Sequence, residues 1–191
     1  MKILVGCEFS QVVTKAFREK GHEAFSCDVL PTEGNPEWHI QGDVLDHLGG
    51  WDLAIFHPPC TYLARSGARW WKDRIKEQEA AIDFVFKLLM ADIPRIALEN
   101  PPGAIGTHIR PSDQYIQPWM FGHPEKKMTG LWLKNLPLLV PTRDVSQEMA
   151  GLSEKDRSRC HYAAPGPDRW KERSRTMEGV GKAMAEQWGS L

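Results

Sequence analysis

Residues 53–63 have the sequence LAIFHPPCTYL, and this segment decides the fold. Its first four residues are apolar, which predicts a short β-strand that is covered on both faces. Two prolines soon follow, and because proline cannot continue a hydrogen-bonded strand, we expect the chain to turn there. Cys60 is then placed at the carboxyl end of a central strand. Open α/β sheets bind their ligands at such strand ends, so Cys60 is the first candidate for a functional residue.

A second strand with the same kind of ending is predicted at residues 93–98, which have the sequence IPRIAL. Glu99 and Asn100 follow it, and then two further prolines. Neighbouring parallel strands end at the same edge of a sheet, so the thiol of Cys60 and the carboxylate of Glu99 are expected to meet. The two strand ends therefore predict one catalytic site. His57 lies beside it, where a general base is one interpretation and a structural hydrogen-bond donor, the more common role of a lone histidine, is the other.

The rest of the chain alternates between predicted strands and helices with short connections. Strands are expected at residues 2–7, 24–28, 39–44, 51–56, 93–98, 115–121 and 129–133. Helices are expected at residues 12–20, 77–90 and 177–188, with loops at residues 101–111 and 122–127. This order predicts an α/β fold with a doubly wound, mostly parallel sheet. We expect a single catalytic domain over residues 1–191, with an irregular basic arm at about residues 142–176.

Composition narrows the class of protein. The 191 residues carry a formal net charge of −1, so any surface that binds nucleic acid must be local. The four cysteines form no CxxC pair and no metal-ligand spacing, which predicts reduced thiols in a cytoplasmic protein without a metal. No apolar run approaches the ~20 residues of a membrane helix, so we expect no membrane partner.

A cofactor site is predicted in the first half of the chain. The turn at residues 6–11, GCEFSQ, lies between the first strand and the first helix, where α/β folds meet the nucleoside part of a cofactor. It lacks the GxGxxG pattern, which disfavours a dinucleotide. Asp28 could bind ribose hydroxyls and Asp43 an adenine amino group, since each ends a predicted strand or nearly does so. An ordinary role in a loop or helix cap is the alternative for each acid.

Two basic segments are candidates for contact with a polyanion. The first follows Cys60 and contains Arg65, Arg69, Trp70, Trp71, Lys72, Arg74 and Lys76. Tryptophan rings can stack on bases while cations bind phosphates, but the solvated start of a helix explains the same pattern equally well. The second segment, residues 157–175, could hold phosphates, and phosphate contacts position a nucleic acid without reading its sequence.

Five short motifs also follow one another in a definite order. They are Phe9-Ser10, Asp28, Gly42-Asp43-Val44, Pro58-Pro59-Cys60 and Glu99-Asn100-Pro101. In order and spacing this series resembles that of the DNA cytosine-5 methyltransferases, and more closely that of their small, phage-type members. Residues 121–129 occupy the place of the family's Gly-x-Pro-Gln-x-Arg-x-Arg motif, and residues 179–185 resemble its closing segment. The resemblance covers nearly the whole chain, and Pro-Pro-Cys followed by Glu-Asn-Pro is its most specific part.

The resemblance implies a Rossmann-like, class I S-adenosylmethionine-dependent methyltransferase fold and methyl transfer to carbon 5 of cytosine in DNA. Carbon 5 is a poor nucleophile, but a thiolate that adds to carbon 6 turns the ring into a reactive enamine. Cys60 would supply this thiolate, activated by a lowered pKa and by backbone donors at its turn. Glu99 would hold the N3 and 4-amino edge of the base and donate a proton. Lys127 would contact the base O2 as a point charge.

The same resemblance assigns the remaining site residues. The residues implied to bind S-adenosylmethionine are Cys7, Glu8, Phe9, Ser10, Asp28, Val29, Asp43, Val44 and Pro58. Those implied to bind the substrate are Pro59, Asn100, Arg65, Arg69, Trp70 and Thr129. A target base in duplex DNA must leave the stack before it can reach such a site.

Three features depart from the family pattern. Gln11 stands where a glycine is expected in the first cofactor loop, and it would crowd the methionine part of the cofactor or contact it. The usual Gln and two Arg of the base-pocket motif are Glu125, Lys127 and Thr129. Only residues 142–164 occupy the place of a target-recognition domain, although groove readout needs such an element. We therefore expect weak sequence specificity, or specificity supplied by a partner or a second copy.

Two other functions would use the same residues. One keeps the chemistry but acts on a free pyrimidine nucleotide or transfers a larger group from a modified donor, which the short chain and altered pocket motif favour. The other is a catalytically idle methyltransferase fold that binds nucleic acid, against which the intact Cys60 and Glu99 argue. In each case the resemblance implies the cytoplasm of a bacterium or of a phage-infected host cell.

Overall fold

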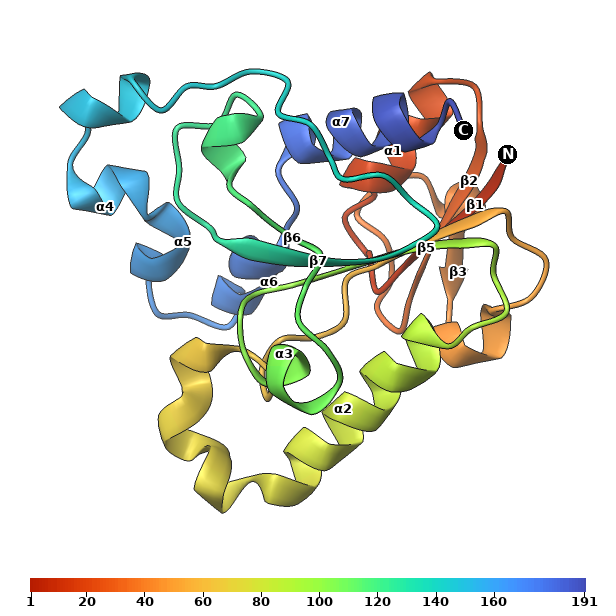
Figure 1. Cartoon of the computed structure of the whole chain (residues 1–191), viewed down its shortest axis with the longest axis horizontal. Helices are drawn as coiled ribbons and strands as arrows, with labels where there is room; N and C mark the ends of the chain where they lie inside the picture. The colour runs from red at the N-terminus through yellow and green to blue at the C-terminus, as the bar shows by residue number, and fades with distance from the viewer.

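The protein, described here by a computed structural model of residues 1–191, is built on a seven-stranded sheet (Figure 1). The strands lie in the order β3-β2-β1-β4-β5-β7-β6. Their bounds are Lys2–Gly6 (β1), Glu23–Asp28 (β2), His39–Gln41 (β3), Leu53–Phe56 (β4), Arg95–Asn100 (β5), Gln114–Ile116 (β6) and Thr129–Lys134 (β7). β1 to β5 are mutually parallel, and β7 runs antiparallel between β5 and β6. The expected α/β fold with a mostly parallel sheet is confirmed, and it is compatible with a Rossmann-like fold.

Helices cover both faces of this sheet. The α-helices are Val12–Glu19 (α1), Ile75–Leu89 (α2), Ala104–His108 (α3), Glu154–Arg157 (α4), Arg159–Tyr162 (α5), Arg169–Ser174 (α6) and Glu178–Trp188 (α7). Short 3-10 helices are Pro36–Trp38 (η1), Val44–His47 (η2), Arg65–Asp73 (η3), Pro118–Met120 (η4) and Glu148–Gly151 (η5). Figure 1 shows α1 and α7 on one side of the sheet and α2 and α3 on the other. No helix is both long enough and apolar enough to cross a membrane.

The central strand β4 is buried on both faces, as predicted. Successive side chains of a strand point to opposite faces, so Leu53 and Ile55 join the core under α1 and α7. Ala54 and Phe56 join the second core, which packs under α2 and α3. The strand order reverses between β1 and β4, because β2 and β3 continue in one direction and β5 in the other. The carboxyl ends of β1 and β4 therefore form the switch point at which such sheets bind ligands.

The expected loop at residues 101–111 contains a short helix, α3, that the sequence pattern did not indicate. Its start is held from outside, because the amide of Ala104 donates to the carbonyl of Leu63 at 2.8 Å. The amide of Arg65 donates to the carbonyl of Pro102 at 2.9 Å, so both strand-end segments are tied together. A β-carbon on Gly103 would collide with the Leu63 carbonyl oxygen, which explains why glycine stands there.

Replacing Gly103 by alanine is therefore expected to lower the free energy of unfolding by about 1–3 kcal/mol, the usual cost of overpacking against backbone. Urea unfolding would measure the loss. Gly106→Ala in the same helix is the matched control, because a β-carbon at Gly106 meets nothing within 4 Å. That control should be neutral or stabilising by up to about 1 kcal/mol, since alanine favours helices over glycine. Equal effects of both substitutions would contradict the proposed clash.

Other boundaries differ from the expected ones. The strand expected at 115–121 is confined to Gln114–Ile116, because Pro118 cannot donate a ladder hydrogen bond and starts η4 instead. It pairs antiparallel with β7. The arm at residues 142–176 is not wholly irregular, since it contains η5 and the short helices α4, α5 and α6. Figure 1 shows α4 and α5 at the end of the molecule opposite the two chain termini, with α6 nearer the middle.

Candidate active site

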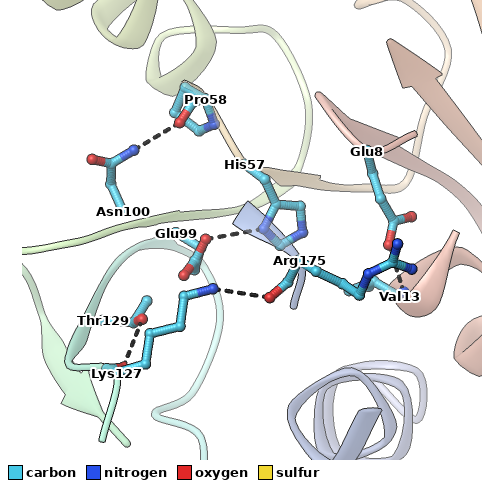
Figure 2. Close-up of polar contacts among 9 residues, drawn as sticks. All are labelled: Glu8, Val13, His57, Pro58, Glu99, Asn100, Lys127, Thr129 and Arg175. Carbon is cyan, nitrogen blue, oxygen red and sulfur yellow. Dashed lines mark hydrogen bonds and ion pairs between the residues drawn. The ribbon is translucent and has the colours of Figure 1, made fainter. Parts of the chain in front are cut away.

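Cys60 lies just beyond the carboxyl end of β4, and Glu99 lies near the end of the paired strand β5, so that the charge of its carboxylate acts on the Cys60 thiol. The turn after β4 is held by its own backbone, because the amides of Leu63 and Ala64 donate to the carbonyl of Cys60 at 3.0 and 2.9 Å. The side-chain amide of the fully buried Asn100 donates to the carbonyl of Pro58 at 2.8 Å (Figure 2). Asn100 therefore braces the proline turn that presents the thiol. Pro58 is buried and Pro59 is exposed.

The electrostatics of Cys60 differ from the sequence-based expectation. Burial raises the pKa of the Cys60 thiol, and the carboxylate of Glu99 raises it further. Lys127 and Arg173 act in the opposite direction, but their effect does not outweigh the other two. The expected lowering of this pKa is therefore wrong for the free protein, in which Cys60 rests as a thiol. A nearby anion and a partly enclosed site both disfavour a thiolate.

Glu99 is the carboxylate of the site, and its pKa is lowered. Burial alone would raise the pKa of its carboxyl, but the hydrogen bond and charge of His57, together with Lys127, hold it below its usual range. The distance between His57 Nδ1 and Glu99 Oε2 is 3.2 Å (Figure 2). These side chains are only 7% and 15% exposed. The sequence shows that His57 precedes the proline turn. Its pairing with Glu99 could not be predicted without knowing the register between β4 and β5.

Lys127 lies beside Glu99 but is held by the arm. Its ammonium donates to the backbone carbonyl of Arg175 at 2.9 Å, and the hydroxyl of the buried Thr129 donates to the Lys127 carbonyl (Figure 2). A cavity of about 20 Å³ adjoins these residues. It is lined by Glu99, Ile116, Pro118, Lys127, Thr129, Thr176, Met177 and Val180. That space holds about one water molecule, so a pyrimidine ring could enter only if the arm shifted.

The first loop of the expected cofactor side is tightly organised. The buried carboxylate of Glu8 accepts from the amide of Val13 at 2.7 Å and from the amide and hydroxyl of Thr14 at 3.2 and 2.7 Å. Glu8 therefore caps the N-terminus of α1. Phe9 and Ser10 are buried, and burial, with the charge of Asp28 next in effect, strongly raises the pKa of the Cys7 thiol.

Gln11 stands where the resemblance led us to expect a glycine, and its side chain forms part of the fold. Its backbone has φ 58°, in the left-handed region that glycine adopts most easily. The side chain is completely buried and accepts from the amide of Asn35 at 2.7 Å. It also donates to the Asn35 carbonyl at 2.8 Å and to the Ser26 hydroxyl at 3.1 Å. Gln11 therefore anchors the loop after β2.

The acids at the next two strand ends differ in environment. Asp28 is half-buried, and burial raises the pKa of its carboxyl even though the Leu30 amide donates to it at 3.0 Å. The Val29 amide and the charge of His39 lower this pKa as well, but burial has the largest effect. The side chain of Val29 is 68% exposed. Asp43 is exposed and caps η2 through the Leu45 amide at 3.0 Å, while Val44 is buried.

Both basic segments flank the site. Arg65, Arg69 and Trp70 are exposed on η3, with the Arg69 guanidinium 5.0 Å from the Trp70 ring centroid. The arm crosses to the cofactor side, where the Trp170 ring lies 5.9 Å from that of Phe9 in an edge-to-face contact. The Arg175 guanidinium pairs with Glu33 at 2.5 Å. Through these contacts and the Lys127 hydrogen bond, the arm joins both halves of the site.

Trp170→Ala is expected to loosen the arm. An edge-to-face aromatic pair contributes about 0.5–1.5 kcal/mol, so tryptic cleavage within residues 158–175 should accelerate about two- to tenfold. Digestion of the native protein, followed by mass spectrometry, would locate the cuts. Trp70→Ala is the matched control, because Trp70 is similarly exposed but lies on η3. Cleavage of the arm that does not change in Trp170→Ala would contradict a docking role for this ring.

Comparison with protein-family models gives no match for this chain, and comparison with curated proteins gives none either. The structure contains no group of three or more His, Cys, Asp or Glu side chains that could hold a metal ion.

Proposed function

We propose that the protein transfers a methyl group from S-adenosylmethionine to carbon 5 of cytosine in DNA, as a small member of the DNA cytosine-5 methyltransferase family. The observation that carries this proposal is the meeting of Cys60 and Glu99 at the ends of adjacent strands, with Lys127 beside them. The sheet order and its single antiparallel strand are compatible with a class I methyltransferase fold. The motif series of this family predicts the same three residues.

Each of the three residues has a defined role in this reaction. The Cys60 thiolate forms a bond to carbon 6 of the ring, which makes carbon 5 nucleophilic. Glu99 holds the N3 and 4-amino edge, and Lys127 supports the charge on the O2 side. S-adenosylmethionine supplies an electrophilic methyl group when bound. After transfer, the carbon 5 proton leaves to a base, the double bond reforms and the Cys60 thiolate is expelled.

The raised pKa of Cys60 links activation of the thiol to binding of the base. The Glu99 carboxylate is one cause of that raised pKa. When the carboxylate takes up a proton from solvent and donates it in a hydrogen bond to N3, its negative charge is neutralised and the Cys60 thiolate becomes easier to form. Cys60 would therefore be activated only when a base occupies the site. This arrangement protects the thiol from side reactions in the free protein.

The cofactor side has residues that suit S-adenosylmethionine. Asp28 offers a half-buried carboxylate at the end of β2 that could bind ribose hydroxyls, and the exposed Val29 lies next to it. Asp43 is exposed at the start of η2 and could accept from an adenine amino group. Glu8 contributes indirectly, because its carboxylate is engaged in capping α1.

DNA is the substrate that best explains the two basic segments. Exposed cations on η3 and on the arm flank the Cys60 turn, where they could neutralise phosphates on both sides of an extruded base. A free pyrimidine nucleotide is the second candidate. It is favoured by the small cavity and by Glu125, whose carboxylate binds Arg159 at 2.6 Å and so ties the pocket motif to the arm.

Incubation with radiolabelled S-adenosylmethionine and either duplex DNA or deoxycytidine nucleotides tests the proposal. Label is expected in DNA, at carbon 5 of cytosine after digestion to nucleosides. If only the free nucleotide gained label, the substrate would be a free pyrimidine nucleotide and not DNA. If neither substrate gained label, the methyltransferase proposal would be wrong. A salt series of DNA binding would then identify a binding protein, because phosphate-dominated affinity falls steeply with salt.

A further inference from the structure

We propose that His57 is a positioning residue, which orients the Glu99 carboxylate for the target base through its Nδ1 hydrogen bond. The inference rests on the proposed function, since it gives His57 a task in the same reaction. Neither the motif series nor the residue pattern assigns this histidine a role in the chemistry.

The position of His57 is fixed by the sheet. It directly follows β4, and its backbone amide donates to the carbonyl of Gly6 at the end of β1, at 2.9 Å. Its ring reaches across to β5, where Nδ1 lies 3.2 Å from Glu99 Oε2. Figure 2 shows the ring between Glu99 on one side and the Glu8 segment on the other. His57 thus lies between the expected base and cofactor halves of the site.

The direction of the hydrogen bond follows from this contact. An ionised carboxylate can only accept hydrogen bonds, so Nδ1 donates to Oε2 of Glu99. Nε2 is buried and has no hydrogen-bond partner. Nδ1 is therefore the only nitrogen through which this ring bonds to a neighbour, and that neighbour is Glu99.

This bond fixes the orientation of the carboxylate. Oε2 accepts from Nδ1 of His57, which sets the plane in which both oxygens face the N3 and 4-amino edge of the cytosine ring. A carboxylate without this partner can rotate about its last torsion, which is soft and broad. A catalytic group displaced by about 1 Å can lose about 100-fold in rate. Loss of the His57 donor is therefore expected to act on the rate of the chemical step more than on the binding of DNA.

A purely structural role makes a different prediction. If His57 only fills space, Phe at this position should serve better than the smaller Asn. If it positions Glu99, Asn should serve better, because its side-chain amide can place a donor near the position of Nδ1, which Phe and Ala cannot do. The comparison of His57→Asn with His57→Phe therefore separates the two roles.

The test measures kcat and KM for methyl transfer to DNA in His57→Ala, His57→Asn and His57→Phe. His57→Ala is expected to lower kcat about 10- to 100-fold with KM for DNA changed less than about threefold. His57→Asn should recover kcat to within about fivefold of the wild type, and His57→Phe should not. His108→Ala is the control, because His108 is exposed on α3 and has no place in the site. Unchanged kcat in His57→Ala, or recovery by Phe, would overturn the proposal.

A second measurement decides the inference even if no methyl transfer is found. Without its His57 partner, Glu99 should hold a proton to higher pH, so Cys60 should react faster with iodoacetamide near neutral pH. His57→Ala should therefore accelerate alkylation about twofold or more in the wild type but not in a Glu99→Gln background. Equal effects in both backgrounds would show that His57 does not act through Glu99. Inactive wild-type protein would refute the proposed function alone.

Discussion

Cys60→Ser is expected to reduce methyl transfer to DNA about 10⁴-fold or more, because the hydroxyl is a far weaker nucleophile than a thiolate. The turn that holds residue 60 is made by its backbone carbonyl, so the substitution should leave the fold intact. Initial rates of label transfer measure the loss. Cytosine that carries fluorine at carbon 5 gives a second readout, because the step that expels Cys60 needs a proton to leave that carbon. The wild type should therefore form an adduct that survives denaturation.

Cys160→Ser is the matched control for the thiol. Cys160 is also partly buried, with a pKa raised by burial, but its sulfur lies against the Lys126 carbonyl at 3.8 Å. This variant should keep both the transfer rate and the adduct. An adduct that persists in Cys60→Ser, or one that is lost in Cys160→Ser, would show that Cys60 is not the cysteine that forms the covalent bond.

The sequence was sufficient to predict the sheet because its strands carry their own signals. β4 and β5 are short apolar runs that stop before prolines, and short apolar runs with such endings are typical of buried parallel strands. The same endings place Cys60 and Glu99 at one edge, so the centre of the site follows from local patterns plus the direction of the strands. Local sequence patterns were therefore enough to predict these strands and the positions at which they end.

The features that were missed depend on contacts between distant residues. The first residue of α3, Ala104, donates its backbone amide to the carbonyl of Leu63. The arm is held by an ion pair between Arg175 and Glu33, which are 142 residues apart in sequence. The pairing of His57 with Glu99 also spans 42 residues. The pKa of Cys60 depends on how deeply the finished fold buries the thiol beside a carboxylate, which no motif encodes.

Glu99→Gln is expected to have opposite effects on catalysis and on the reactivity of Cys60. Methyl transfer should fall about 10²- to 10³-fold, because glutamine cannot share an exchangeable proton with N3 of the base. In the free protein, however, the carboxylate raises the pKa of the Cys60 thiol. Without it, more thiolate is present at a given pH, so alkylation of Cys60 near neutral pH should accelerate about three- to tenfold.

The pH dependence of Cys60 alkylation shows independently whether Glu99 raises or lowers the pKa of the thiol. A thiol with a raised pKa becomes reactive only as the pH rises, so the alkylation profile of Glu99→Gln should lie at lower pH than that of the wild type. Glu125→Gln is the matched control, since Glu125 raises the pKa of Cys160 and is not a cause of the shift at Cys60. Its Cys60 profile should not move. If the alkylation profile of Glu99→Gln did not move, the Glu99 carboxylate would not be a cause of the raised Cys60 pKa. If Glu99→Gln retained methyl transfer, Glu99 would have no role in the reaction.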